Sequence, residues 1–294
     1  MIIEVKGVSY RYPGQPDREA IENADLTIEP GVTLLMGPNG AGKTTLLHLL
    51  ATLLYPRKGT IDFLADDDTE LPAYGRHPSL MERMFFLPET LELQQKDINT
   101  LAKTHAPFYP GFSPEMLRSN LEEFGVDINK PFKNMSLGEK KRALFSYALS
   151  LGTDLLLLDE PVNGMDMGAR DTARSMLARC TDPERQCVVM STHTVADFKP
   201  LFDDVVHIER GHITLAAKTW KITDKLAFVM ESVPSADALF TARDMGMFRS
   251  IVPIQGREEL ETDIDLHLLY QALGNEHTAK KIIKSIYGDD YKQD

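Results

Sequence analysis

The sequence predicts an α/β protein with a largely parallel β-sheet that helices cover on both faces. Two apolar segments, at 155–160 (LLLLDE) and 187–193 (CVVMSTH), have the composition of strands but lack alternating polar residues. Strands that are buried on both faces and separated by helices are typical of parallel sheets. A glycine-rich turn at 37–45, between an expected strand and an expected helix, is also typical of this class.

The expected elements begin with three strands. These are 2–13 (IIEVKGVSYRYP), 24–30 (ADLTIEP) and 32–36 (VTLLM), separated by proline and glycine residues. The apolar run 44–54 predicts a helix that Pro56 ends, and 59–68 predicts a further strand with a charged turn.

From about 91 to 133 the pattern is helical, with loops at 105–114 and 127–131. A helix of roughly two dozen residues is expected between the two buried strands. Residues 205–215 then predict a hairpin with Arg210 and Gly211 at its turn.

The pattern of apolar and polar residues changes after Ala217. Strands are expected at 225–233 and 247–254 around a helix at 235–246, followed by a helical stretch that starts at 261–274. We therefore predict a main domain at 1–216, and an accessory α+β region at 217–294 with a βαβ arrangement and a final helix. The acidic run 258–265 is expected to be a solvated helix start.

Composition limits the possible partners. The chain has 294 residues and a net charge of −12, so it repels nucleic acid phosphates unless it carries a local basic patch. Its longest basic cluster, Lys140–Arg142, is a weak one, and we expect no nucleic-acid partner. No stretch approaches the roughly 18 apolar residues of a membrane helix, and no secretion signal is apparent. Cys180 and Cys187 are expected to be unpaired thiols of a cytoplasmic protein.

The turn at 37–45 reads GPNGAGKTT and matches the phosphate-binding pattern G-x-x-x-x-G-K-[ST]. Its glycines allow backbone N–H groups to converge on phosphate oxygens, and the helix that follows adds the positive end of its dipole. The pattern predicts that Lys43 reaches the β- and γ-phosphates and that Thr44 binds Mg²⁺. The expected nucleotide-binding residues here are Gly37, Pro38, Asn39, Gly40, Ala41, Gly42, Lys43, Thr44 and Thr45.

Two acidic residues follow the first buried strand. Asp159 and Glu160 come at its carboxyl end, where α/β sheets bind ligands. We expect Asp159 to hold Mg²⁺ through water and Glu160 to polarise the attacking water. His193 ends the second buried strand at the same edge and could contact the γ-phosphate.

Taken together, these motifs resemble the nucleotide-binding subunits of ABC transporters over residues 1–215. The segment 135–142 (MSLGEKKR) is similar to the ABC signature, and 161–166 (PVNGMD) is similar to the loop that crosses between subunits. The resemblance implies that Ser136, Gly138 and Glu139 bind the ATP held by the opposite subunit. It also implies that Tyr12 stacks on adenine, with Tyr10 as the less favoured candidate.

Two positions depart from the family pattern. Leu137 stands where the family usually has glycine, and Glu89 stands where a glutamine usually binds Mg²⁺. A surface role for Glu89 is the alternative reading. With the segment 108–117, these departures resemble type-2 ABC exporter ATPases of bacterial operons with GntR-type regulators.

The resemblance implies a P-loop ABC ATPase core: a mixed sheet with helices on both faces, an antiparallel β subdomain, and a helical subdomain at about 90–140. It implies an ATPase that uses ATP and Mg²⁺ and forms a head-to-tail homodimer with ATP at the interface. A separate integral membrane permease would hold this dimer at the inner face of the cell membrane. The alternatives are a soluble ABC ATPase without a membrane partner, such as an iron–sulfur assembly scaffold, and, more remotely, a P-loop small-molecule kinase.

Overall fold

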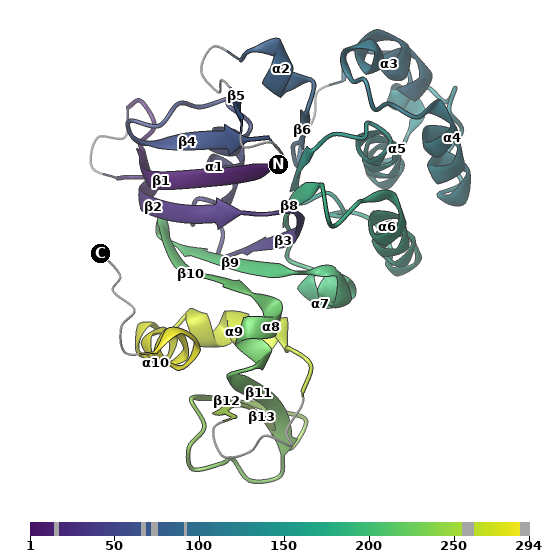
Figure 1. The fold of residues 1–294 in the computed structure, drawn as a ribbon. Helices are drawn as coiled ribbons and strands as arrows, with labels where there is room; N and C mark the ends of the chain where they lie inside the picture. Colours follow the sequence, from purple (N-terminus) through teal and green to yellow (C-terminus); the bar gives the residue numbers. More distant parts are fainter. Residues whose placement is uncertain (15–17, 66–68, 72–75, 91–92, 255–261, 289–294) are drawn as a thin grey trace.

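Figure 1 shows the computed structural model of the chain, coloured from the N-terminus to the C-terminus. The structure describes residues 1–294 apart from 15–17, 66–68, 72–75, 91–92, 255–261 and 289–294. These described residues form three sheets of four, six and three strands. No helix in the described ranges is both long enough and apolar enough to cross a bilayer.

The first sheet is antiparallel and has the order β2-β1-β4-β5. Its strands confirm the expected strand character of the N-terminal region. They are β1 (Ile2–Tyr10), β2 (Ile21–Ile28), β4 (Lys58–Leu64) and β5 (Glu70–Leu71).

The second sheet has the order β10-β9-β3-β8-β7-β6. It is parallel except for the edge strand β10, which pairs antiparallel with β9. Its strands are β3 (Gly31–Met36), β6 (Met84–Leu87), β7 (Leu155–Asp159), β8 (Cys187–Ser191), β9 (Asp204–Glu209) and β10 (His212–Lys218). The expected hairpin is confirmed. Arg210 and Gly211 have φ angles of 51° and 87° at its turn, as a tight hairpin connection requires.

The six-stranded sheet is buried on both faces because consecutive side chains of its strands enter two different cores. Leu35 packs with β1, β2, β4 and the helix α1 (Lys43–Leu50), which lies between the two sheets. Leu34 packs on the opposite face, together with the outer helices. This division explains why the strands lack alternation in the sequence.

The outer face carries helices that polar side chains cap at their N-termini. Asp97, Ser113, Ser136 and Asp166 each accept a backbone N–H three residues later. These residues precede α3 (Ile98–His105), α4 (Pro114–Glu123), α5 (Leu137–Leu149) and α6 (Met167–Cys180). Short helical segments complete this part of the chain: α2 (Pro78–Met81), α7 (Val195–Phe198), Ala106–Phe108, Phe132–Asn134 and Lys199–Leu201.

Two predicted helix lengths were wrong. Helix α1 ends at Leu50 rather than near Pro56 because Thr52 adopts a left-handed φ of 53° and the N–H groups of Leu53 and Leu54 both turn back to His48 O. Helix α6 has 14 residues rather than about two dozen, since residues 161–166 form the turn that precedes it.

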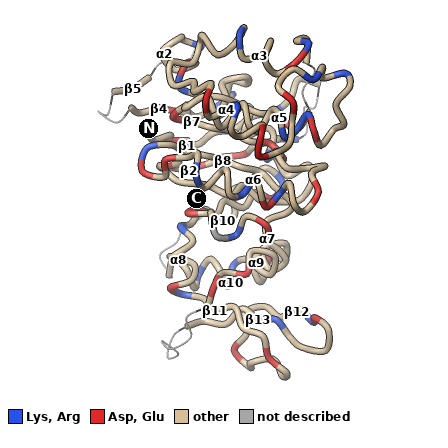
Figure 2. Tube along the Cα trace, turned by 90° about the vertical axis from the view of Figure 1, so that its right-hand side faces the viewer, with Lys and Arg blue, Asp and Glu red and all other residues tan. Residues whose placement is uncertain are grey.

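In its described residues, the C-terminal region contains the antiparallel sheet β11-β13-β12 and three helices. Its elements are α8 (Thr219–Thr223), β11 (Leu226–Glu231), β12 (Phe240–Asp244), β13 (Met247–Pro253), α9 (Leu266–Leu273) and α10 (Glu276–Tyr287). In Figure 2 this sheet lies at the end of the molecule opposite α2 and α3. Part of the acidic run, 258–261, falls outside the described residues, and Asp265 caps α9.

The prediction of a helix at 235–246 was wrong. The predicted βαβ arrangement was therefore wrong as well. Residues Phe240–Asp244 form β12, and Met245 and Gly246 connect it to β13 with φ angles of 45° and 88°. Phe240 and Ala242 pack against the core, so the segment follows the two-residue period of a strand.

The C-terminal region shares its core with the rest of the chain. Ile222, Leu226 and Leu269 are buried in the same cluster as Phe198 and Val205. A division of the chain at 216–217 therefore stays a prediction about domain organisation, and the buried contacts cross it.

Candidate nucleotide-binding site

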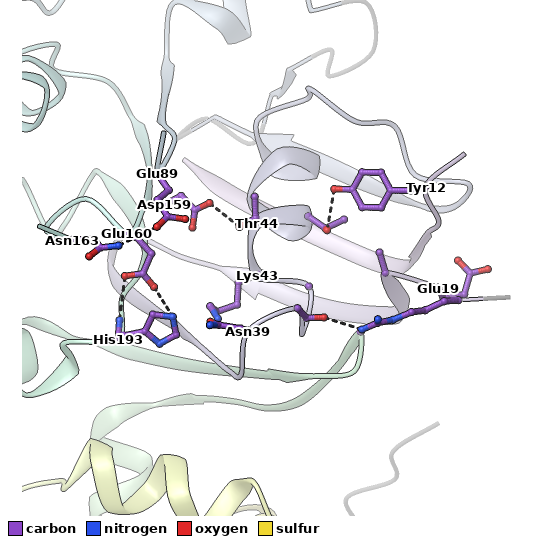
Figure 3. Close-up of a pocket in the computed structure, with 16 residues that line it drawn as sticks. Tyr12, Glu19, Asn39, Lys43, Thr44, Glu89, Asp159, Glu160, Asn163 and His193 are labelled. Atoms are coloured by element: carbon purple, nitrogen blue, oxygen red, sulfur yellow. Dashed lines mark hydrogen bonds and ion pairs between the residues drawn. The ribbon is translucent and has the colours of Figure 1, made fainter. Parts of the chain in front are cut away.

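A cavity of about 530 Å³ lies where β3 and β7 end and α1 begins (Figure 3). A volume of this order is typical of small-ligand sites. Among the predicted site residues that line it are Tyr12, Asn39, Gly40, Gly42, Lys43, Thr44, Thr45, Glu89, Asp159, Glu160 and His193. Arg18, Glu19, Ala20, Asn163 and Gly211 line it as well.

Two positions of the glycine-rich turn, 37 and 42, leave no room for a side chain. A Cβ on Gly37 would lie 2.1 Å from Ile208 O, and one on Gly42 would lie 2.6 Å from Ala20 O. Both residues also have positive φ angles, 154° and 118°. The turn therefore passes close to the main chain at Ile208 of β9 and at Ala20, and its residues Asn39, Gly40 and Gly42 line the cavity, as expected for a phosphate cradle.

Lys43 lies at the start of α1, and its side chain is directed along this turn. Its Nζ donates to Gly37 O at 2.7 Å and to Pro38 O at 3.2 Å. Burial lowers the pKa of Lys43, while the nearby Glu160 and Asp159 act in the opposite direction. The ammonium is therefore held at the centre of the cradle by main-chain oxygens that phosphate oxygens could replace.

Asp159 and Thr44 meet on the floor of the cavity. Thr44 Oγ1 donates to Asp159 Oδ2 at 2.8 Å, and Ser191 Oγ donates to Asp159 Oδ1 at 2.6 Å. Asp159 is only 3% exposed, so these two hydroxyls hold a buried carboxylate in one orientation. Hard oxygen ligands of this kind fit Mg²⁺, which favours carboxylates, phosphates and water.

Glu160 has an unusual backbone. Its φ of 46° is left-handed, a conformation that costs a non-glycine residue about 1–3 kcal/mol. The Glu160 N–H donates to Ser191 O at 3.1 Å and is 3.0 Å from Ser191 Oγ. Contacts with β8 therefore hold this backbone in place, and the side chain enters the cavity.

The Glu160 carboxylate faces His193. His193 N–H donates to Glu160 Oε2 at 3.3 Å, and the ring Nε2 is 3.2 Å from Oε1. Burial raises the pKa of Glu160, whereas His193 and Lys43 act in the opposite direction. A carboxylate with limited solvation at this position is suited to accept a proton from water.

Glu89 and Asn163 join the same cluster from two neighbouring loops. Asn163 Nδ2 donates to Glu89 Oε1 at 3.0 Å. Glu89 follows β6, which pairs in parallel with β7, so its side chain lies beside the carboxyl end of the strand that carries Asp159. The carboxylate is exposed at the cavity, where it could bind a metal ion.

Tyr12 lies at the opposite end of the cavity from Glu160 (Figure 3). Its hydroxyl is 3.2 Å from Thr45 Oγ1, and its ring meets that of Tyr10 edge to face at 5.1 Å. Tyr10 is only 8% exposed and belongs to the core between the sheets. The geometry favours Tyr12 over Tyr10 as the aromatic that meets a base.

The segment 135–142 forms the N-terminus of α5 and does not contribute to this cavity among its described lining residues. Ser136 and Glu139 cap the helix reciprocally: Ser136 N–H donates to Glu139 Oε2 at 2.8 Å, and Glu139 N–H donates to Ser136 Oγ at 3.2 Å. Lys130, whose Nζ lies 2.6 Å from Glu139 Oε1, and the Ser136 amide lower the pKa of Glu139 to about 2. The Glu139 carboxylate thus already has two partners in its own chain.

Gly138 and Leu137 lie next to the segment 161–166. A Cβ on Gly138 would lie 3.0 Å from Gly164 O, which explains the glycine at this position. Leu137 is 66% exposed and would contact a Cβ on Gly164 at 3.4 Å. The signature segment and the loop after β7 therefore lie side by side, and the Leu137 side chain is free to meet a partner.

Similarity to known proteins agrees with this geometry. A family model described as ABC transporter matches residues 21–163. The zinc import ATP-binding protein ZnuC of Pseudomonas syringae pv. syringae (strain B728a) is 31% identical over 234 residues, which cover 78% of this chain and 80% of that protein. The chain belongs to the ATP-binding proteins of the ABC transporter family.

Other relatives and structures agree with this family. The uncharacterized ABC transporter ATP-binding protein YcbN of Bacillus subtilis (strain 168) is 26% identical over 217 residues, covering 72% of this chain and 68% of that protein. The structure of an ABC transporter ATP-binding subunit superposes with a TM-score of 0.64 at 22% identity, covering 76% of this chain and 92% of that one. A dimeric bacterial ABC transporter cassette superposes with a TM-score of 0.61 at 20% identity, covering 74% and 98%. The predicted ABC ATPase fold is confirmed.

Family membership makes this chain an ATPase of the ABC type that uses ATP and Mg²⁺. Subunits of this family dimerise and work with membrane permeases. The individual roles assigned to site residues stay predictions.

Sequence reasoning missed several residues that line the cavity or support it. Arg18 Nη2 donates to Gly40 O at 3.1 Å, and Asn163 holds Glu89. Asn163 could have been found because it lies within the expected crossing loop. Lys141, whose Nζ donates to the main-chain oxygens of Glu89 and Glu160, lies within the segment 135–142 and the short basic cluster 140–142, but neither pattern assigned it a role of its own.

Proposed function

We propose that this chain is the ATP-hydrolysing subunit of an exporter and powers a separate integral membrane permease. The observation that carries the ATPase part is the convergence of Lys43, Thr44, Asp159, Glu160 and His193 on one cavity. Export is supported by the resemblance of Glu89, Leu137 and the segment 108–117 to exporter ATPases.

In this proposal each residue has a defined task. The glycine-rich turn and Lys43 bind the β- and γ-phosphates of ATP, and the ring of Tyr12 stacks on its base. Thr44, Asp159 and Glu89 would hold Mg²⁺, which would supply charge neutralisation on the phosphates. Glu160 accepts a proton from the attacking water, and His193 orients the Glu160 carboxylate and meets the γ-phosphate.

Two copies of the chain form a head-to-tail dimer around two ATP molecules. Ser136 is exposed and Gly138 is half-buried at the N-terminus of α5, a helix of 13 residues whose dipole favours an anion. These groups bind the γ-phosphate in the cavity of the opposite subunit, and closure of the dimer is passed to the permease through the helical region at about 90–140. The complex would lie at the inner face of the cell membrane.

Import is the second candidate direction. It is supported by the names of relatives about 30% identical to this chain, which are zinc import ATP-binding proteins. The residues that turn over ATP would be the same, so the two directions differ in the permease and the cargo.

One pair of experiments tests the proposal. Mild crosslinking in intact cells and recovery of this chain should capture a polytopic membrane protein; recovery without one contradicts the permease part. The captured pair is then reconstituted in vesicles with the ATPase subunit outside. ATP-dependent accumulation of a cargo inside the vesicles supports export, whereas release of preloaded Zn²⁺ that requires ATP supports import.

A further inference from the structure

Lys141 is a buried lysine whose ammonium is held by two main-chain carbonyls. It lies in the first half of α5 and is 5% exposed. Lys141 Nζ donates to Glu160 O at 3.2 Å and makes a second hydrogen bond to Glu89 O. A buried cation of this kind is rare unless it has partners, and none of the tasks assigned above uses it.

The two carbonyls belong to different loops of the site. Glu160 O lies at the left-handed residue that follows β7, and Glu89 O lies in the loop that follows β6 and leads to the helical region with α3 and α4. β6 and β7 are neighbours, with Leu87 opposite Leu158, so the two loops leave the sheet side by side. Lys141 reaches them from a third element.

The Glu160 backbone needs this support. Its strained φ is maintained by the Ser191 contacts on the N–H side and by Lys141 on the carbonyl side. The side-chain contact between Asn163 and Glu89 is a second connection between the same two loops. Lys141 connects the two main chains directly, because its one buried ammonium donates to both Glu89 O and Glu160 O.

We propose that Lys141 is a positioning residue for ATP hydrolysis, which joins the Glu89 loop to the backbone of Glu160 and so makes turnover depend on the position of the helical region. The inference rests on the proposed role of Glu160. Lys141 does not line the cavity and is not expected to touch ATP. Its loss should therefore lower kcat and leave the KM for ATP nearly unchanged.

Lys141→Met keeps the aliphatic stem and removes the donor. We expect kcat to fall roughly 10- to 100-fold, the size of effect that follows from misplacing a reacting group by about 1 Å. Lys141→Arg keeps N–H donors at the same place and should recover part of the rate. Lys281→Met, at an exposed position of α10 away from the cavity, is the control and should keep the parental kcat. If Lys141→Met does not fold, Lys141→Gln takes its place, because its shorter side chain removes the ammonium that joins the two carbonyls while keeping a polar group at this position.

A double variant separates positioning from general damage. If Lys141 acts through Glu160, Lys141→Met in a Glu160→Gln background should lower the residual rate by less than twofold. Three results would each overturn the inference. The first is a further 10- to 100-fold fall in kcat when Lys141→Met is added to Glu160→Gln, and the second is a raised KM for ATP at unchanged kcat in Lys141→Met. The third is a kcat of Lys141→Arg no higher than that of Lys141→Met. The two proposals fail separately: Glu160→Gln at the parental rate removes the proposed role of Glu160, whereas a large loss there with Lys141→Met fully active removes only the role of Lys141.

Discussion

Replacing Glu160 by glutamine isolates the charge of this side chain, because the amide has nearly the same shape. The Gln oxygen can still accept the His193 N–H that Glu160 Oε2 accepts at 3.3 Å. What is lost is the ability to take a proton from water. General-base catalysis contributes about 10²- to 10⁴-fold, so we expect kcat to fall by that factor, or about 3–5 kcal/mol in activation free energy.

The fold should tolerate this change. Burial raises the pKa of Glu160 above its ordinary value of 4.5, which means that ionisation of this group weakens the folded state as pH rises through the folded-state pKa. Glutamine carries no such penalty at neutral pH. The melting temperature of Glu160→Gln at pH 7 should therefore equal or exceed the parental one, and the difference should shrink as pH falls below that pKa.

The assay is steady-state phosphate release with purified protein, together with ATP binding, gel filtration in Mg·ATP and a thermal melt. We expect weak turnover, retained ATP binding and a dimer that persists with ATP. Glu115→Gln, at a carboxylate that is 78% exposed, is the control and should behave like the parent. Parental turnover in Glu160→Gln would falsify the assignment of the base. A melting temperature lowered by several degrees, with ATP binding lost, would show that Glu160 is structural.

Three further predictions follow from single contacts. Glu89→Gln should keep the parental kcat at saturating Mg²⁺ but shift the Mg²⁺ concentration that gives half-maximal ATPase activity, because a neutral oxygen replaces a charged one. An unchanged Mg²⁺ titration would show that Glu89 is only a surface residue. Tyr12→Ala should raise the KM for ATP about 5- to 150-fold through lost stacking, worth about 1–3 kcal/mol per base, whereas Tyr12→Phe should change it little; equal effects in both variants would instead assign the loss to the hydroxyl. Leu269→Ala should lower the free energy of unfolding by about 2–5 kcal/mol in urea denaturation, since Leu269 is fully buried in the shared core. Met230→Ala, at an exposed position of the same region, should change it by less than about 0.5 kcal/mol.

The acid limb of the activity should reflect the same carboxylate. Glu160 must be ionised to accept a proton, and its raised pKa means that activity is lost as pH falls through a value above 4.5. A pH profile of kcat for the parent and for Glu160→Gln checks this, since the acid limb should be absent from the variant. An identical acid limb in both proteins would assign it to another group.

The sequence by itself determined the elements in which local pattern and chemistry coincide. The spacing of Gly37, Gly42 and Lys43 predicted the phosphate turn, because its backbone geometry depends on glycine at fixed positions. The unbroken apolar runs predicted β7 and β8, because strands buried on both faces have no polar side to alternate. Asp159, Glu160 and His193 could be placed at one edge because neighbouring parallel strands end together.

Only the tertiary structure decided the features that depend on distant contacts. The segment Phe240–Asp244 reads as part of a helix until β13 offers it backbone partners, and its strand identity comes from that pairing. The shared core of Phe198 and Leu269 joins residues 71 positions apart, which no local pattern indicates. The sequence places Lys141 in a short basic cluster and in the segment 135–142 and assigns it no role. Its burial and its two carbonyl partners exist only because α5 packs against the loops that follow β6 and β7. There the Lys141 ammonium donates to both Glu89 O and Glu160 O.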